Sequence, residues 1–413
     1  MNSRIRNGFS AAALSATLAM SLAAPVVADD STHEDIGSAI AAGDANVDLR
    51  YRYEFVDQDT FAEDANASTL RLRLNYKTGA WRGWSGFAEF DQVMEVLVDD
   101  FNSGSGTSSA NRSQYPVVAD PNGSDLNQLY FQYAPNEDWR TRIGRQRILL
   151  DDQRFVGGVG WRQNEQTYDA LSVQYSGFEK TRLFYSYVGN VNRIFGSEVP
   201  AGDHDQDTHL LNAKVGLADG WDVVGYAYLI DNDDAPAFST STFGARLTGG
   251  FALGEGRAAV LADIARQSDA GNATASFDAD YFRLQGTWSI DALVLGIGFE
   301  SLGSDNGQGF RTPLATLHAF NGWADQFLGT PGTGLEDLYL KAAYKYQPWS
   351  FQLVYHDFSA ESGSGDYGSE IDLSAGRGLG QRYKLLLKLA MFNADSTAFT
   401  DTTKAWLMLS AGF

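Results

Sequence analysis

Apolar and polar residues alternate with a period of two along most of the chain. From position 47 to position 55, apolar side chains at odd positions interleave with charged side chains such as Asp48, Arg50 and Glu54. The same alternation recurs in 69–76, 338–346 and 383–389. Because successive side chains of a strand point to opposite faces, each segment predicts a strand with one apolar face and one polar or charged face.

The alternation predicts about 18 strands, most of them close to the length of about ten residues that a tilted membrane strand requires. The expected strands span 46–57, 68–78, 84–97, 126–134, 139–148, 167–177, 181–190, 207–217, 221–231, 239–250, 256–267, 275–289, 291–302, 337–347, 349–358, 369–378, 381–393 and 402–413. Strands of a soluble β-sandwich are usually shorter, at about five or six residues.

The expected links alternate between short and long. Short links include 135–138 and 177–180, whereas long links include 98–125, 149–166 and 303–336. An outer-membrane barrel has short periplasmic turns and long extracellular loops. The pattern therefore indicates an all-β transmembrane antiparallel barrel over 46–413. A soluble secreted β-protein is the alternative, although a sandwich has no reason to sort its links in this way.

The N-terminus has the features of a secretory signal peptide. Arg4 and Arg6 precede an apolar stretch of small residues, and Val26-Val27-Ala28 resembles a cleavage site. We therefore expect a signal peptide over 1–28, a short periplasmic segment over 29–45, and a mature chain in the bacterial outer membrane. Outer-membrane lipid and lipopolysaccharide are then its expected surroundings.

Aromatic residues lie at the ends of the expected strands. The tryptophans at or near short links are Trp81, Trp84, Trp139, Trp221, Trp288 and Trp349. This placement fits an aromatic girdle at one membrane interface. The chain ends in an amphipathic strand whose last residue is Phe413, and such an end resembles the assembly signal of bacterial outer-membrane proteins. The barrel-assembly machinery is therefore an expected partner.

Composition excludes several other classes of protein. The sequence has no Cys, which rules out disulfide frameworks, thiolate zinc sites and Cys nucleophiles. Its formal net charge of −21 argues against a nucleic-acid partner, which normally meets a basic surface. The chain contains neither a G-x-S-x-G nor an H-E-x-x-H motif, and the best triad fragment is His356-Asp357 with Ser359 nearby. We expect no enzyme activity, no catalytic residues, no metal and no cofactor.

One acidic segment invites comparison with a calcium loop. Asp203-His204-Asp205-Gln206-Asp207 places carboxylates at alternate positions, as calcium loops do. The segment lacks the following Gly and a distal Glu in register. Solvated loop charge, or divalent bridging to lipopolysaccharide phosphates, is the favoured interpretation, and calcium binding stays open.

Basic side chains recur on the polar face of the expected strands. The inward basic residues taken as pore-lining and anion-binding are Arg50, Arg52, Arg71, Arg73, Arg142, Lys341, Lys345, Lys384 and Lys388. Such charges are tolerated only in a wet lumen, and rings of Arg and Lys favour anions. Inward acids such as Glu89 and Asp91 are expected as ion-pair partners, so a mixed and weakly selective lumen is the alternative.

The segment from Gly144 to Leu171 is the most distinctive stretch of the chain. A break in the alternation at Gly144 suggests a bulge, after which Arg145 and Arg147 would turn inward. The following loop is polar and rich in Gly, and it carries Asp151, Asp152, Arg154 and Arg162. We expect it to fold into the lumen and constrict it; an ordinary surface loop is the alternative.

The run GRQ…DDQRFVG…WRQN…TYDAL resembles the signature of the alginate-export family of outer-membrane channels. The preceding segment WSGFAEFDQV, from Trp84 to Val93, is also similar to that family. The resemblance implies a single-chain barrel with an Arg-rich lumen that passes an anionic polysaccharide or related anions. The pore residues it implies are Arg142, Arg145, Arg147, Arg154 and Arg162, with Asp151 and Asp152 as their ion-pair partners.

The expected function is therefore passage of hydrophilic, anionic solutes through a channel. Export of a polysaccharide and passage of oligosaccharides or organic anions both fit this expectation, and an anionic saccharide or small anionic solute is the expected ligand. The alternative is a plugged structural or adhesion barrel of the outer membrane without transport.

Overall fold

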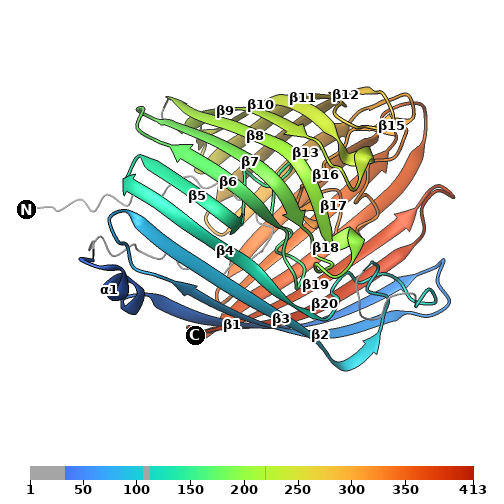
Figure 1. Ribbon diagram of the computed structural model, residues 1–413. Coiled ribbons are helices and arrows are strands. Elements are labelled where there is room, and N and C mark those ends of the chain that lie inside the picture. The colour runs from blue at the N-terminus through green and yellow to red at the C-terminus, as the bar shows by residue number, and fades with distance from the viewer. Residues whose placement is uncertain (1–32, 106–111, 219) are drawn as a thin grey trace, which may run out of the picture.

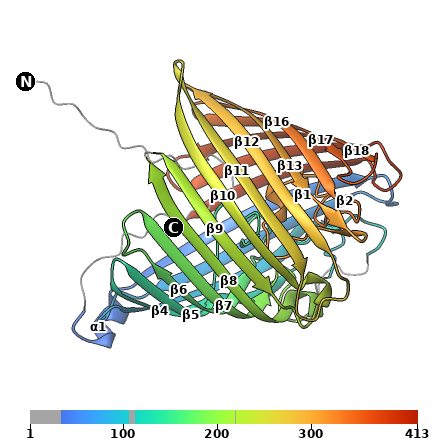
Figure 2. The same ribbon diagram turned by 90° about the horizontal axis from the view of Figure 1, so that it is seen from above.

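The computed structural model describes residues 33–105, 112–218 and 220–413. Eighteen antiparallel strands form one sheet, and the first strand pairs with both the second strand and the last. The sheet therefore closes on itself as a barrel of tilted strands (Figures 1 and 2). The predicted fold class and strand number are confirmed. The predicted signal peptide lies outside the described residues.

Each strand lies close to its predicted position. The strands of the barrel are β1 Asp44–Gln58, β2 Ala65–Lys77, β3 Trp84–Asp100, β4 Gly123–Asn136, β5 Trp139–Gln146, β6 Thr167–Tyr175, β7 Thr181–Asn192, β8 Asp203–Ala218, β9 Trp221–Ile230, β10 Thr240–Leu253, β11 Gly256–Asp269, β12 Asp278–Ile290, β13 Leu293–Leu302, β16 Leu335–Tyr346, β17 Trp349–Ser359, β18 Asp366–Leu379, β19 Tyr383–Ala394 and β20 Thr402–Gly412.

Short elements accompany the barrel. They are the helix α1 Ile36–Ala41, the 3-10 turns η1 Pro200–Gly202, η2 Pro236–Phe238 and η3 Leu317–Ala319, and the two-stranded hairpin of β14 Ser304–Asp305 and β15 Gln308–Gly309. The C-terminus and α1 lie at the same end of the barrel (Figure 1). Phe413 and Val47 exchange two backbone hydrogen bonds, at 2.9 and 3.0 Å, and so join the last residue to β1.

The outer face of the barrel is apolar. Ile264 and Ile297 are each more than half exposed, as are Phe131 and Ile143 on the neighbouring β4 and β5. Trp139 and Trp349 begin strands that follow short turns, as the girdle pattern predicts. Among the described residues, no helix is long and apolar enough to cross a membrane.

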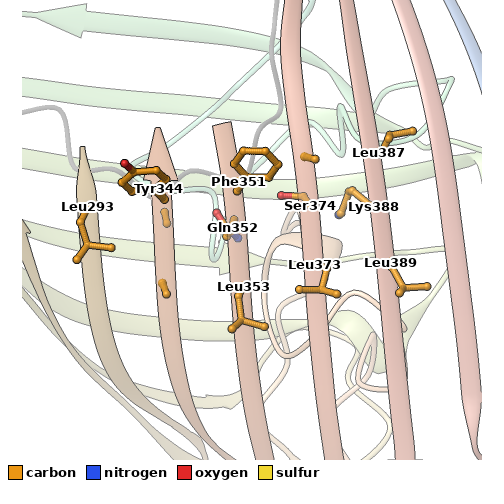
Figure 3. A pocket seen from close by; sticks show the side chains of 13 residues that line it. Leu293, Tyr344, Phe351, Gln352, Leu353, Leu373, Ser374, Leu387, Lys388 and Leu389 are labelled. Atoms are coloured by element: carbon orange, nitrogen blue, oxygen red, sulfur yellow. The ribbon is translucent and has the colours of Figure 1, made fainter. Parts of the chain in front are cut away.

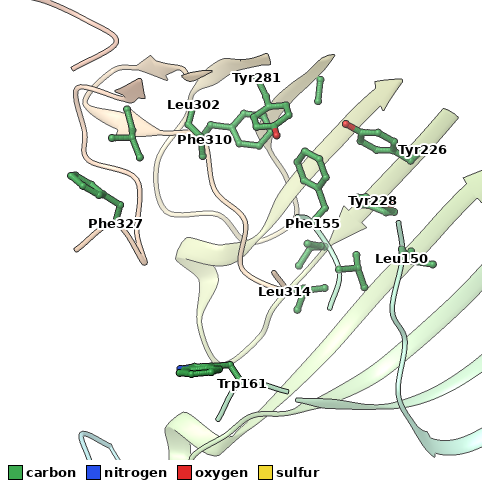
Figure 4. Packing of buried hydrophobic residues seen from close by; sticks show 14 of the residues in the cluster. Leu150, Phe155, Trp161, Tyr226, Tyr228, Tyr281, Leu302, Phe310, Leu314 and Phe327 are labelled. Carbon is green, nitrogen blue, oxygen red and sulfur yellow. The ribbon is translucent and has the colours of Figure 1, made fainter. Parts of the chain in front are cut away.

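Two long segments fold into the barrel and meet there. We call residues 147–166 the constriction loop and residues 303–334 the facing loop. Gly157 of the constriction loop donates a 2.8 Å backbone hydrogen bond to Leu314 of the facing loop. Phe155 packs against Tyr281 and Phe310, with ring centroids 5.2 and 6.1 Å apart (Figure 4). The sequence predicted the inward fold of the constriction loop but not that of the facing loop.

Candidate functional site

Arginines of β1 hold the backbone of the constriction loop. Arg50 donates through Nη1 to the carbonyl of Gly160 at 3.0 Å and through Nε to Gln163 at 2.9 Å. Arg52 donates to the carbonyl of Trp161, and its guanidinium carbon lies 4.3 Å from the centroid of that ring. Both arginines are buried. They therefore anchor the loop, whereas the alternation of the strand predicts anion-binding residues of an open pore at these positions.

The neighbouring arginines are neutralised by carboxylates. Arg73 of β2 makes two parallel hydrogen bonds to Asp91 of β3, at 2.7 and 2.5 Å, and a third to Glu165 at 2.6 Å. Arg147 also binds Glu165, and it binds Glu89 at 2.5 Å. Burial of Glu165 opposes its ionisation, but Arg147 and Arg73 outweigh that effect and lower its pKa. The predicted ion-pair roles of Glu89 and Asp91 agree with this geometry.

Two other charged residues of the constriction loop, Asp152 and Arg154, reach the opposite wall. Asp152 accepts hydrogen bonds from Arg246 at 2.5 Å and Arg283 at 2.7 Å. Its burial opposes ionisation, yet these two cations lower its pKa to about 2. Arg154 donates to Glu300 at 2.6 Å and is almost fully buried.

Other members of the loop and of β2 complete this network. Arg162 pairs with Glu54 at 2.9 Å, and Asp151 accepts from Asn212 at 2.8 Å. Arg71 pairs with Asp48 at 2.6 Å. The implied pore arginines of the loop are thus ion-paired, but among the described residues neither implied acid pairs with them. Asp152 binds Arg246 and Arg283, and Asp151 binds the amide of Asn212.

Arg145 lies on the other face of its strand. The register between β5 and β6 runs through Gly144 without a shift, so the expected bulge is absent. Arg145 consequently shares the outward face with Ile143, and it pairs with Asp169 of β6 at 2.8 Å. Gly144 is required for a different reason: its φ is +119°, and a Cβ there would lie 2.4 Å from the carbonyl oxygen of Leu129. The prediction that Arg145 lines the lumen is therefore wrong.

The facing loop is anchored by carboxylates of the wall, whereas the constriction loop is anchored by arginines. The backbone N–H of Ala324 donates to Glu370 at 2.7 Å, and that of Trp323 donates to Asp372 at 3.2 Å. Both carboxylates come from β18 and are fully buried. The wall therefore holds one loop through its carbonyls with arginines and the other through its N–H groups with carboxylates.

Lys388 of β19 joins the two loops. Its Nζ lies 2.7 Å from Nε2 of His318, and 4.0 and 3.6 Å from the ring centroids of Trp161 and Trp323. Asp325 accepts from Nδ1 of His318 at 2.8 Å, which leaves Nε2 free to accept from the lysine. His318 and Asp325 were not predicted as site residues, because they lie in a long loop without periodicity.

Besides Arg50 and Lys388, which contact the inward loops, four of the predicted basic residues have no carboxylate partner among the described residues. They are Arg142, Lys341, Lys345 and Lys384, and among the described residues none of them forms an ion pair. Arg142 donates to Gln132 at 2.9 Å and lies 4.9 Å from the ring centroid of Tyr130. All four lie on the half of their strands nearer the short turns.

The triad fragment His356-Asp357 with Ser359 is not arranged as a catalytic triad in the structure. His356 bonds to Asp337 of the neighbouring strand at 2.9 Å, and Asp357 lies on the other face of β17. Within the described ranges, no group of three or more His, Asp or Glu side chains is arranged to hold a metal ion.

Comparison with known proteins supports the resemblance seen in the sequence. The family model of alginate export matches residues 43–186. No curated protein matches the chain. Among solved structures, the Pseudomonas aeruginosa protein OpdK, crystallised with vanillate, is 14% identical, with a TM-score of 0.70 over 90% of this chain and 98% of that one.

Two further structures are equally similar in fold. Pseudomonas aeruginosa OccK9 (OpdG) is 13% identical, with a TM-score of 0.74 over 91% of this chain and 99% of its own. Acinetobacter baumannii OccAB4 is 12% identical, with a TM-score of 0.72 over 90% of this chain and 98% of its own. At these identities the likeness establishes the barrel fold.

Proposed function

We propose that this chain is an outer-membrane channel that passes small, hydrophilic, anionic solutes. An apolar outer face and a charged, polar interior suit a barrel that spans a bilayer and encloses water. The family match over 43–186 and the likeness to OpdK, which was crystallised with vanillate, support the same class of solute.

The balance of accessible charge in the lumen carries this proposal. Inward acids such as Asp91, Glu165 and Glu300 are bonded to arginines, and the acids of β18 are fully buried under the facing loop. The inward cations Arg142 and Lys341 have no carboxylate partner among the described residues and are only partly buried. Among the described residues, the exposed Asp151 binds only the amide of Asn212, but the unpaired cations Arg142, Lys341, Lys345 and Lys384 outnumber it, and such a lumen favours anions.

The two inward loops set the size of the solute. Side chains from both loops pack against the wall and against each other, so that Gln163, Phe310 and Leu314 are buried inside the barrel. This filling favours organic acids and short uronate oligomers over a long polysaccharide chain. Partly exposed guanidinium groups such as that of Arg142 suit carboxylates, which they bind through paired hydrogen bonds.

A plugged structural barrel is the second candidate. The observation that favours it is the complete burial of loop and wall residues such as Arg52 and Phe310 in the middle of the barrel. The two functions differ in whether ions cross, so conductance in planar bilayers separates them. We expect discrete single-channel steps; a purified barrel that inserts but carries no current would favour the plug.

Solute class is tested by swelling of liposomes that contain the protein. We expect faster swelling in a small carboxylate such as vanillate than in a neutral aromatic alcohol of similar size. Equal rates for the two solutes would contradict the anionic preference.

The proposal also covers export of the chain and its assembly into the outer membrane. We infer that residues 1–28 are removed after export, near Ala28, and that 29–45 form a short segment on the periplasmic side. Phe413, which pairs with Val47, is the proposed contact for the barrel-assembly machinery. Mass spectrometry of the protein extracted from outer membranes tests the cleavage site.

A further inference from the structure

The apolar outer face carries a hollow. It spans β13 and β16 to β19 and has a volume of about 490 Å³ (Figure 3). Two small residues form its floor: Ala342, which is paired with Leu353, and Ala375, which is paired with Phe351 and Leu387. The hollow therefore exists because alanine stands where neighbouring outward positions carry Leu or Phe.

The hollow lies toward the end of the barrel that carries the short turns. Phe351 is the third residue of β17, and Trp349 begins that strand directly after the turn. In β18, Arg377 follows Ala375 on the same outward face and is paired with Trp349. The apolar hollow thus continues into the aromatic girdle, where the headgroups of the periplasmic leaflet lie.

Arg377 is a cation without a carboxylate partner among the described residues at that level. Its guanidinium carbon lies 5.2 Å from the ring centroid of Trp349, and its buried Nε has no hydrogen-bond acceptor within the described residues. The side chain is only partly buried. Stacking on the indole fixes the plane of the guanidinium, so that its terminal Nη groups are directed in advance toward an anion.

We propose that this face binds one glycerophospholipid of the periplasmic leaflet, with an acyl chain in the hollow and the phosphate on Arg377. The inference rests on the proposed membrane location but not on transport. In a bilayer the hydrophobic effect does not distinguish one apolar surface from another. Selection would instead come from dispersion contacts that fill the hollow and from charge-assisted hydrogen bonds to the phosphate.

A second copy of the chain is the competing occupant. It would bury Arg377 against another outer face. The outward positions around the hollow offer no carboxylate there and are mostly apolar, such as Leu353, Leu373 and Leu387. A buried cation without a carboxylate is costly. A phosphate supplies the missing charge, so the observations favour a lipid.

The test is native mass spectrometry of the full mature barrel, released from detergent micelles after incubation with phosphatidylethanolamine and phosphatidylglycerol. We expect one tightly held phospholipid on the unaltered protein. The double variant Ala342→Leu with Ala375→Leu fills the hollow and should remove that adduct. Arg377→Gln keeps the hollow and should weaken binding about tenfold through loss of charge-assisted hydrogen bonds.

Matched controls lie elsewhere on the barrel. Ala227→Leu adds the same bulk on the outer face of β9, and Arg82→Gln removes a girdle arginine that lies 5.4 Å from the ring centroid of Trp81. Both should keep the adduct. Heat-dependent gel migration shows for every variant whether the barrel has folded.

Three results would overturn the inference: an unaltered barrel without the adduct, an adduct that survives filling of the hollow, or a filled hollow that abolishes self-association. The last would assign the face to a second copy. Conductance of the same samples tests transport separately. A barrel that binds the lipid but carries no current would refute the channel alone.

Discussion

Lys388 and His318 are joined by a 2.7 Å contact between Nζ and Nε2, which ties the barrel wall to the facing loop. His318 also stacks on Trp161 of the constriction loop, with ring centroids 4.3 Å apart. One imidazole therefore contacts the wall and both inward loops. Its charge state should decide how firmly the loops are held.

Acidification should loosen this junction. Burial of His318 and the nearby Lys388 lower its pKa well below the ordinary value, although Asp325 opposes them. A histidine that resists protonation when folded contributes stability above its unfolded pKa of about 6.5 and loses it as the pH falls below that value. We expect proteolysis of the loops and current noise to rise between about pH 6.5 and 5. In His318→Gln, which cannot titrate, both should stay flat over that range; a matching rise there would show that another group is responsible.

Removal of the Glu165 charge should free the constriction loop. Glu165→Gln removes the carboxylate that Arg73 and Arg147 share, but Arg73 keeps Asp91 and Arg147 keeps Glu89. We therefore expect a cost below the roughly 3–5 kcal/mol of a buried charge left without any partner. We expect a lower unfolding temperature in detergent and larger current fluctuations. Glu255→Gln, in an exposed turn, is the control. Equal thermal stability of the two variants would show that the pairs do not hold the loop.

Gly144→Ala should impair folding of the barrel. A side chain at φ +119° is strained by about 1–3 kcal/mol, and its Cβ would also meet the carbonyl oxygen of Leu129. We expect a smaller heat-modifiable fraction in outer membranes. Gly123→Ala, at a position with open space around its Cβ, should fold normally. Normal yields of both variants would mean that the backbone at Gly144 can relax.

The barrel could be predicted from sequence because its signal is repeated. Every strand must cross the same bilayer, so the alternation within each strand and the order of short and long links carry the same information. A wrong boundary at one strand therefore leaves the predicted barrel unchanged. The interior was harder. Alternation places Arg50 and Arg52 inward. It does not show that their guanidinium groups donate hydrogen bonds to the loop carbonyls of Gly160 and Trp161.

The outward position of Arg145 and the inward fold of the facing loop could not be predicted from the sequence pattern. Gly144 was read as a bulge, yet a glycine with positive φ keeps the register, so Arg145 falls on the outward face. The facing loop has no periodicity, and the partners of His318 and Asp325 come from strands far away in sequence. Lys404, which binds Asp325 at 2.9 Å, does follow the inward alternation of β20 and was the available signal.

The central claim is that unpaired lumen cations select anions. Reversal potential in a salt gradient across a planar bilayer measures this for Arg142→Glu combined with Lys341→Glu, with Arg266→Glu at the exposed end of β11 as control. We predict an anion-selective potential for the unaltered channel and the control, and a shift toward cation selectivity in the double variant. An unchanged potential in the double variant would contradict the account, because these two side chains would then lie outside the conduction path.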